Sequence, residues 1–128
     1  MGYTIHMQDW VTARASSSSA VVLQPESDYL DISMFKDFAA YIEIAEFVSG
    51  VGVNVKLQTA PVKEEVYFQD LVTVTPSAAG IATPIPVVRY STGGGAVAPA
   101  RWLRWRCGAT MPDWGITFRI NINCNPSD

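Results

Sequence analysis

Apolar and polar residues alternate through the clearest segments of this sequence, and this pattern constrains the fold more than any other feature. In residues 51–59, Val53, Val55 and Leu57 fall on one face, as in a strand with one buried side. The chain also has 14 Val and 9 Ile against 5 Leu, and branched side chains favour pleated sheets. The sequence therefore predicts an all-β protein.

Short runs of this kind, bounded by Pro and Gly, recur at the spacing of turn-connected strands. We expect about eight strands joined by connections too short for helical crossovers, which predicts an antiparallel β-sandwich or jelly roll. A Pro-rich entry places the strand at 85–90 at a sheet edge or at a strand start. The loop 91–100, with Gly93-Gly94-Gly95, is expected to be the most mobile. Seven of the expected strands are residues 21–24, 29–32, 51–59, 65–75, 85–90, 101–107 and 116–122. A further one lies within residues 33–48.

Residues 33–48 fit two patterns. Ser33 is a candidate helix N-cap, and four apolar residues follow it at helical spacing: Phe35, Phe38, Ala39 and Ile42. Residues 41–47 instead alternate as a strand does. We interpret the segment as a turn over 34–37 followed by a strand, with the helix as the alternative.

The first twenty residues stand apart from the rest. Ser16 to Ser19 form a tract typical of a flexible joint, and it follows a segment with Ile5, Met7, Trp10 and Val11. That segment is either the first strand of the domain or an arm that docks on a neighbouring subunit. We favour an extended N-terminal arm, which gives an arm and joint over 1–20 and a single β-sandwich domain over 21–128.

Charge and targeting signals limit the partners of the chain. Only 16% of residues are charged, below the roughly 25% of typical domains, so either the core is large or partner subunits cover apolar surface. A net charge of −3 gives no general attraction for nucleic acid or anionic lipid. The start lacks the basic and apolar regions of a signal peptide, and no apolar run could span a membrane. We expect folding without secretion and no membrane partner.

The last two strands carry the strongest pattern, and we predict that 101–107 and 116–122 form a hairpin. Its apolar face holds Leu103, Trp105, Cys107, Ile116, Phe118, Ile120 and Ile122. Its other face is predicted as a contact surface, because Trp and Arg are enriched at interface hot spots; it holds Trp102, Arg104, Arg106 and Arg119. Ion pairing with Asp or Glu of a neighbouring strand is the alternative, and base stacking is a less favoured one.

Residues suited to catalysis are few. His6 is the only histidine, so a catalytic triad or a multi-histidine metal site is not expected. Glu64 and Glu65 are neighbours, which on a strand point to opposite faces. No phosphate-binding glycine motif is present. We therefore predict no enzyme and no catalytic, cofactor-binding or metal-binding residue.

Trp114 and the two cysteines have competing interpretations. Trp114 is a candidate glycan contact in the loop 111–115, or a lid packed on the end of the sandwich. Cys107 and Cys124 would lie roughly 27 Å apart in the predicted hairpin, at about 3.3 Å per residue, too far for a disulfide. We predict two small core residues.

Two segments carry a resemblance to a known group of proteins. Residues 30–35 (LDISMF) and 53–61 (VNVKLQTAP), with the final RWLRWR and FRI runs, resemble small β-sandwich proteins of tailed-phage virions over about residues 28–124. Those proteins have an L-D-V-S-x-Y entry and a V-x-L-Q-T-S-P strand end. Many members continue with a Gly/Asn turn and a Trp, where this chain has VKEEVYF at 62–68, so the resemblance gives that turn no ligand-binding role.

The resemblance implies a non-enzymatic structural protein of a virion that is assembled in the host cytoplasm. The expected role is capsid decoration or stabilisation, as a homo-oligomer with a trimer favoured, bound to the major capsid protein or other virion proteins. Head and tail locations both remain open. The alternative is a carbohydrate- or receptor-binding module on a virion or cell surface, using Trp114.

Overall fold

In the part of the chain that the structure describes, the secondary structure consists of nine strands and two short 3-10 turns, which confirms the all-β prediction. The computed structural model describes residues 3–17, 20–48, 52–76, 85–91, 99–110 and 112–126; for Lys36, 85–91 and Pro126 it describes the backbone alone. The 3-10 turns are η1 (Glu26–Asp28) and η2 (Glu65–Tyr67). The strands are β1 (Tyr3–Ala15), β2 (Val22–Leu23), β3 (Leu30–Asp31), β4 (Phe35–Val48), β5 (Asn54–Ala60), β6 (Gln69–Val74), β7 (Ile85–Ser91), β8 (Trp102–Gly108) and β9 (Trp114–Pro126).

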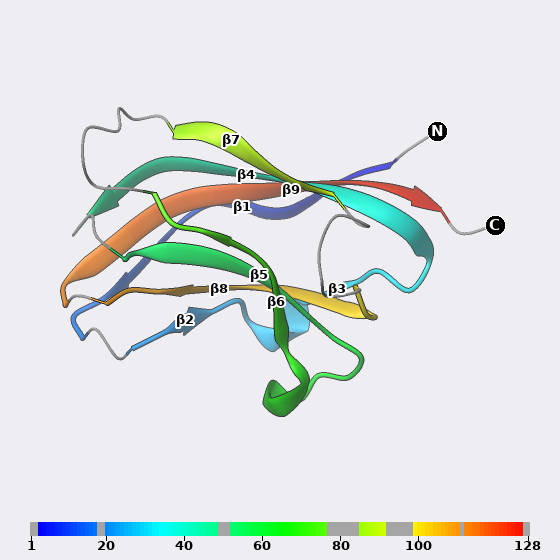
Figure 1. Ribbon diagram of the computed structural model, residues 1–128, viewed down its shortest axis with the longest axis horizontal. Coiled ribbons are helices and arrows are strands. Elements are labelled where there is room, and N and C mark those ends of the chain that lie inside the picture. The colour runs from blue at the N-terminus through cyan, green and yellow to red at the C-terminus, as the bar shows by residue number, and fades with distance from the viewer. Residues whose placement is uncertain are drawn as a thin grey trace.

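The strands form two antiparallel sheets that pack face to face (Figure 1). Sheet A has the order β1-β9-β4-β7, and sheet B has the order β2-β8-β5-β6, with β3 also paired to β8. Because β2 and β3 both pair with β8, they act as one interrupted strand. Counted in this way, the sandwich has eight strands, as the sequence predicts.

The pairing is nested, which makes this sandwich a jelly roll. The first strand pairs with the last, β2 and β3 pair with β8, β4 pairs with β7, and β5 pairs with β6. A chain paired in this way is a long hairpin wound around a common core, with its bend at the β5–β6 connection. The remaining pairs, β4 with β9 and β5 with β8, close each sheet.

The core lies between the sheets and follows the alternation in the sequence. Trp105 of β8 meets Phe118 of β9 edge to face, with ring centroids 5.0 Å apart, a favourable aromatic geometry. The strongest contributors are nearly inaccessible apolar residues of four strands: Phe38, Ile42, Ile44, Val55, Leu57, Leu103, Cys107, Ile116, Ile120 and Ile122.

The structure corrects the prediction of an N-terminal arm. Residues 3–15 form β1, which pairs with β9 of the same chain from Tyr3↔Cys124 to Ala15↔Trp114. Met7 is buried, and Ile5 and Val11 pack against the core. The segment is therefore the first strand of the sandwich, which was the other interpretation of its apolar residues. An apolar edge strand and a docking arm have the same composition, so the sequence could not separate them.

The predicted final hairpin is also wrong, because β8 lies in sheet B and β9 in sheet A. The chain passes from one sheet to the other between β8 and β9, where Asp113 has a φ of 56°, a conformation that Asp tolerates better than most residues. The same alternating side chains are buried whether the two strands pair in one sheet or face each other across a sandwich. Alternation therefore predicts which face of a strand is buried, but not which strand pairs with it. Cys107 and Cys124 are free and buried, as predicted.

The uncertain segment 33–48 is a strand. A turn at 33–34 precedes β4, so the strand begins at Phe35, earlier than predicted. The side chain of Asp31 accepts a hydrogen bond from the Ser33 amide at 2.9 Å, so Ser33 belongs to this turn and caps no helix. β7 is an edge strand, as predicted. Gly93 to Gly95 lie outside the described residues. Among the residues described, no helix has the length and apolar character needed to cross a membrane.

Candidate binding surfaces

The predicted cationic surface is divided between the two sides of the molecule. Trp102, Arg104 and Arg106 belong to β8 in sheet B, whereas Arg119 belongs to β9 in sheet A. Their side chains point outward on opposite sides of the sandwich because each strand turns its apolar face to the shared core. The four residues therefore do not form a single surface.

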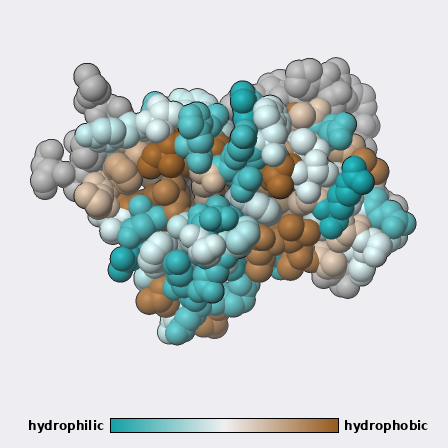
Figure 2. Space-filling model, turned by 180° about the vertical axis from the view of Figure 1, so that it is seen from behind, coloured by the Kyte–Doolittle hydropathy of each residue, from teal (hydrophilic) through white to brown (hydrophobic). Residues whose placement is uncertain are grey.

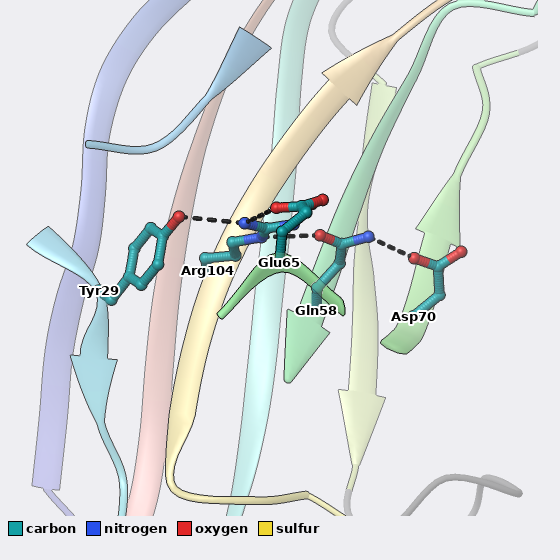
Figure 3. Close-up of polar contacts among 5 residues, drawn as sticks. All are labelled: Tyr29, Gln58, Glu65, Asp70 and Arg104. Atoms are coloured by element: carbon teal, nitrogen blue, oxygen red, sulfur yellow. Dashed lines mark hydrogen bonds and ion pairs between the residues drawn. The ribbon is translucent and has the colours of Figure 1, made fainter. Parts of the chain in front are cut away.

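Arg104 is the buried centre of a polar network on the outer side of sheet B (Figure 3). Its guanidinium donates to Gln58 Oε1 at 2.8 Å, to the Tyr29 hydroxyl at 3.1 Å and to Glu65 Oε1 at 2.9 Å. The side chain is only 2% exposed. The prediction that Arg104 is a contact residue is therefore wrong, because the segments around η1 and η2 fold over this part of the sheet.

Gln58 extends the network to the next strand. Its amide Nε2 donates to Asp70 Oδ1 at 2.7 Å, and Asp70 also pairs with Lys56 at 3.2 Å. The hydrogen bond from Arg104 lowers the pKa of Glu65 although burial opposes it. Burial acts to raise the pKa of Asp70, but its bonds to Gln58 and Lys56 lower it overall. Both carboxylates are thus held in the charged form.

The network fixes the connection between β5 and β6, residues 61–68, which we call the tip. Glu65 of η2 is tied to Arg104, and the Arg104 guanidinium carbon lies 3.7 Å from the Phe68 ring centroid. Lys63 donates to the Glu26 carbonyl at 3.2 Å and lies 4.3 Å from the Trp102 ring centroid. Such cation–aromatic contacts are favourable. The tip is therefore held at several points along its length.

Three apolar side chains of the tip are exposed, beside the exposed Glu64 and Glu65. Val66 is 82% exposed, Tyr67 51% and Val62 43%. Figure 2 shows hydrophobic residues reaching the surface at the bottom of the molecule, where this connection lies. Large apolar side chains held in water on a fixed loop are typical of contact sites. The sequence analysis gave this turn no binding role, because three neighbouring charged residues, Lys63, Glu64 and Glu65, conceal its apolar ones.

The outer side of sheet A is polar and open. Across β1, β9 and β4, side chains line up in rows such as His6–Asn121–Tyr41 and Thr4–Asn123. Arg119 is hydrogen-bonded to Glu43 on the neighbouring strand, which is the cross-strand ion pair named as an alternative for this residue. Its side chain is 38% exposed.

Trp114 does not present its ring to solvent. The residue is 2% exposed, and its indole Nε1 donates to the Ser17 carbonyl at 3.2 Å. This geometry contradicts a glycan contact and agrees with the alternative of a tryptophan packed down on the sandwich. The exposed tryptophan is Trp10, 45% exposed on β1.

Groups suited to chemistry remain scattered in the described part of the chain. Burial raises the pKa of the Cys107 thiol well above its ordinary value, which makes it a poor nucleophile. No cluster of His, Cys, Asp and Glu suited to a metal is found among the described residues.

Comparison with known proteins identifies no family. No family model and no curated protein matches the sequence. The cleaved K2 adhesin domain of Lys-gingipain is similar over 98% of this chain and 89% of its own, at 10% identity and a TM-score of 0.45. A structure of infectious bursal disease virus, Gx strain, is similar over 99% of this chain and 42% of its own, at 11% identity and a TM-score of 0.34. Such low scores carry no functional information.

Proposed function

We propose that this chain is a non-enzymatic structural protein of a phage virion that decorates the capsid and binds the major capsid protein through the tip. One observation carries the proposal. Three exposed apolar residues, Val62, Val66 and Tyr67, lie on a connection that a buried arginine holds in place. Holding a contact loop in advance lowers the entropy lost on binding.

The partner in this proposal comes from the sequence resemblance, and the rest of the molecule is compatible with it. A capsid lattice offers many identical sites, so weak contacts made by an oligomer add up to firm attachment. The exposed Val62, Val66 and Tyr67 suit the centre of such a contact, where apolar and aromatic residues are enriched, and Glu64 and Glu65 suit its polar rim. A homo-oligomer, with a trimer as the favoured order, would present several tips at once.

Co-sedimentation with shells assembled from the major capsid protein of the same virus tests this function. We expect the wild-type protein to pellet with shells and a Val66→Asp/Tyr67→Asp double variant to bind at least tenfold more weakly. Val48→Asp is the matched control, since Val48 is 56% exposed at the end of β4 in the other sheet. Equal pelleting of the double variant and the wild type would overturn the role of the tip.

Light scattering separates self-association from shell binding. The double variant is expected to keep the molar mass of the wild-type protein, because the tip is assigned to the shell. A loss of oligomers in the double variant would mean that the tip holds copies of this chain together.

A further inference from the structure

The outer face of sheet A carries a tryptophan that the edge strand projects by means of a β-bulge. Gln8 pairs with Ile120 and Val11 with Phe118, so that Asp9 and Trp10 together stand opposite the single residue Arg119. A bulge of this kind redirects a side chain and is enriched near functional sites. Here it places Trp10 beside Arg119, with the guanidinium carbon 4.8 Å from the ring centroid.

The bulge is held from both sides of the sheet. On the inner side, Gln8 Oε1 accepts a hydrogen bond of 3.0 Å from the indole of the core residue Trp105. On the outer side, Asp9 Oδ1 accepts one of 2.8 Å from the Trp10 amide. Gln8 Nε2 also donates to the Asp9 carbonyl at 3.0 Å. The exposed position of Trp10 is therefore set by the fold.

Two hollows adjoin one another on this face and share Asn121. One, of about 340 Å³, is lined by His6, Gln8, Asp9, Arg119 and Asn121. The other, of about 350 Å³, is lined by Thr4, Tyr41, Glu43, Asn121, Ile122 and Asn123. Each lies at the small end of the volumes typical of ligand sites, roughly 300–1,000 Å³. Together they line β9 from Arg119 to Asn123.

The lining indicates the chemistry of the ligand. Amides, hydroxyls, a histidine and a guanidinium–carboxylate pair offer donors and acceptors in planar groups, which suit neighbouring hydroxyls. The Arg119 guanidinium lies over one face of the Trp10 ring, so the other face is the one that suits the C–H side of a pyranose. Among the described residues lining the hollows, Arg119 is the one cation and stands against Asp9 and Glu43. A neutral ligand fits this balance better than an anionic one.

We propose that the outer face of sheet A binds a neutral oligosaccharide, with two successive sugar units over the two hollows and one unit stacked on Trp10. The site is independent of the tip, which lies on the other sheet. Tip variants and sugar-site variants can therefore fail separately, and neither result decides the other proposal.

An array of neutral and acidic oligosaccharides, followed by calorimetric titration with the neutral oligosaccharide that binds best, tests the site. We expect the wild-type protein to bind neutral members, and Trp10→Ala and Asn121→Ala to weaken binding at least tenfold. Tyr67→Ala is the matched control, because it removes an exposed aromatic ring from the tip and is expected to bind as the wild type does. Circular dichroism checks that each variant keeps its fold.

Three outcomes would overturn the proposal. The first is no binding to any neutral member of the array. The second is Trp10→Ala and Asn121→Ala both binding as the wild type does. The third is a preference for acidic members of the array over neutral ones, which would assign the face to anions.

Discussion

Arg104 and Arg119 have the same kinds of partners on opposite sides of the sandwich. Arg104 pairs with Glu65 and lies against Phe68, and Arg119 pairs with Glu43 and lies against Trp10. The Arg104 side chain is 2% exposed and that of Arg119 is 38% exposed. Both guanidinium groups therefore have one glutamate and one aromatic ring as partners, but only that of Arg119 is open to solvent.

The difference arises from what lies over each sheet. On sheet B the segments around η1 and η2 cover Arg104, so its charge is paired with Glu65 and its other N–H groups donate to Gln58 and Tyr29. An arginine without such partners would carry a large desolvation cost. Arg119 keeps water around it, which screens its pair with Glu43. Because chain segments cover Arg104, it serves as a structural anchor, whereas the uncovered Arg119 remains accessible from solvent.

Removing Arg104 is expected to have the largest effect on stability. Arg104→Ala leaves Gln58 and Tyr29 without a buried partner and opens a space beside Phe68, so we expect a loss of about 3 kcal/mol of unfolding free energy. Urea denaturation followed by tryptophan fluorescence measures it. Arg119→Ala is the control, and an equal loss there would show that coverage does not distinguish the two sides.

Removing the bridge to Asp70 is expected to cost less. Gln58 is 4% exposed, and Gln58→Leu deprives both Arg104 and Asp70 of a hydrogen bond, for a loss of about 1–3 kcal/mol. The same denaturation experiment applies. The control is Thr12→Ala, which breaks the exposed Thr12–Thr117 bond of 2.7 Å in sheet A. If the urea midpoint of Gln58→Leu equals that of the wild type, the stability of the network does not depend on Gln58.

Acid is expected to weaken the anchor through Glu65. Its pKa is lowered in the folded protein from an ordinary value of 4.5, so its contribution is complete above about pH 4.5 and is lost as pH falls through the lower folded-state value. Glu65→Gln should therefore be less stable than the wild type at pH 7, by roughly 1 kcal/mol because Glu65 is largely in water. Thermal melts from pH 7 to pH 2 should show the two proteins converging. A constant difference across that range would rule out this linkage.

The smallest effect is expected on sheet A. Arg119→Gln breaks the exposed pair with Glu43, and exposed pairs contribute little to stability. We expect its melting temperature to stay close to that of the wild type at both low and high salt. A fall as large as that of Arg104→Ala would show that Arg119 supports the fold.

Much of the fold follows from the sequence, because alternation reports directly which side chains are buried. Ile116, Phe118 and Ile120 point inward as predicted. The pairing of the strands does not follow from the sequence, because two strands with apolar faces bury those faces equally well in the same sheet and in opposite sheets. The predicted hairpin of 101–107 and 116–122 failed for this reason.

The candidate sites were harder to predict than the core. Arg104 alternates as a solvent-facing residue, and only the tertiary course of η1 and η2 buries it. Tyr29 and Gln58 carried no signal, because their role depends on partners 75 and 46 residues away. Trp10 was predicted as an interface residue of an N-terminal arm, and its projection from β1 depends on a bulge that alternation cannot show.

The nested strand order also has a consequence for how this chain reaches its native state. Of the strands that the structure describes, β5 and β6 alone are both consecutive and paired, so their contacts need the shortest loop closure. Pairing β1 with β9 brings together Tyr3 and Cys124, nearly the full length of the chain. Non-local pairing of this kind slows folding. We expect the bend at the tip to form early and the β1–β9 pair late, in a slow folding reaction.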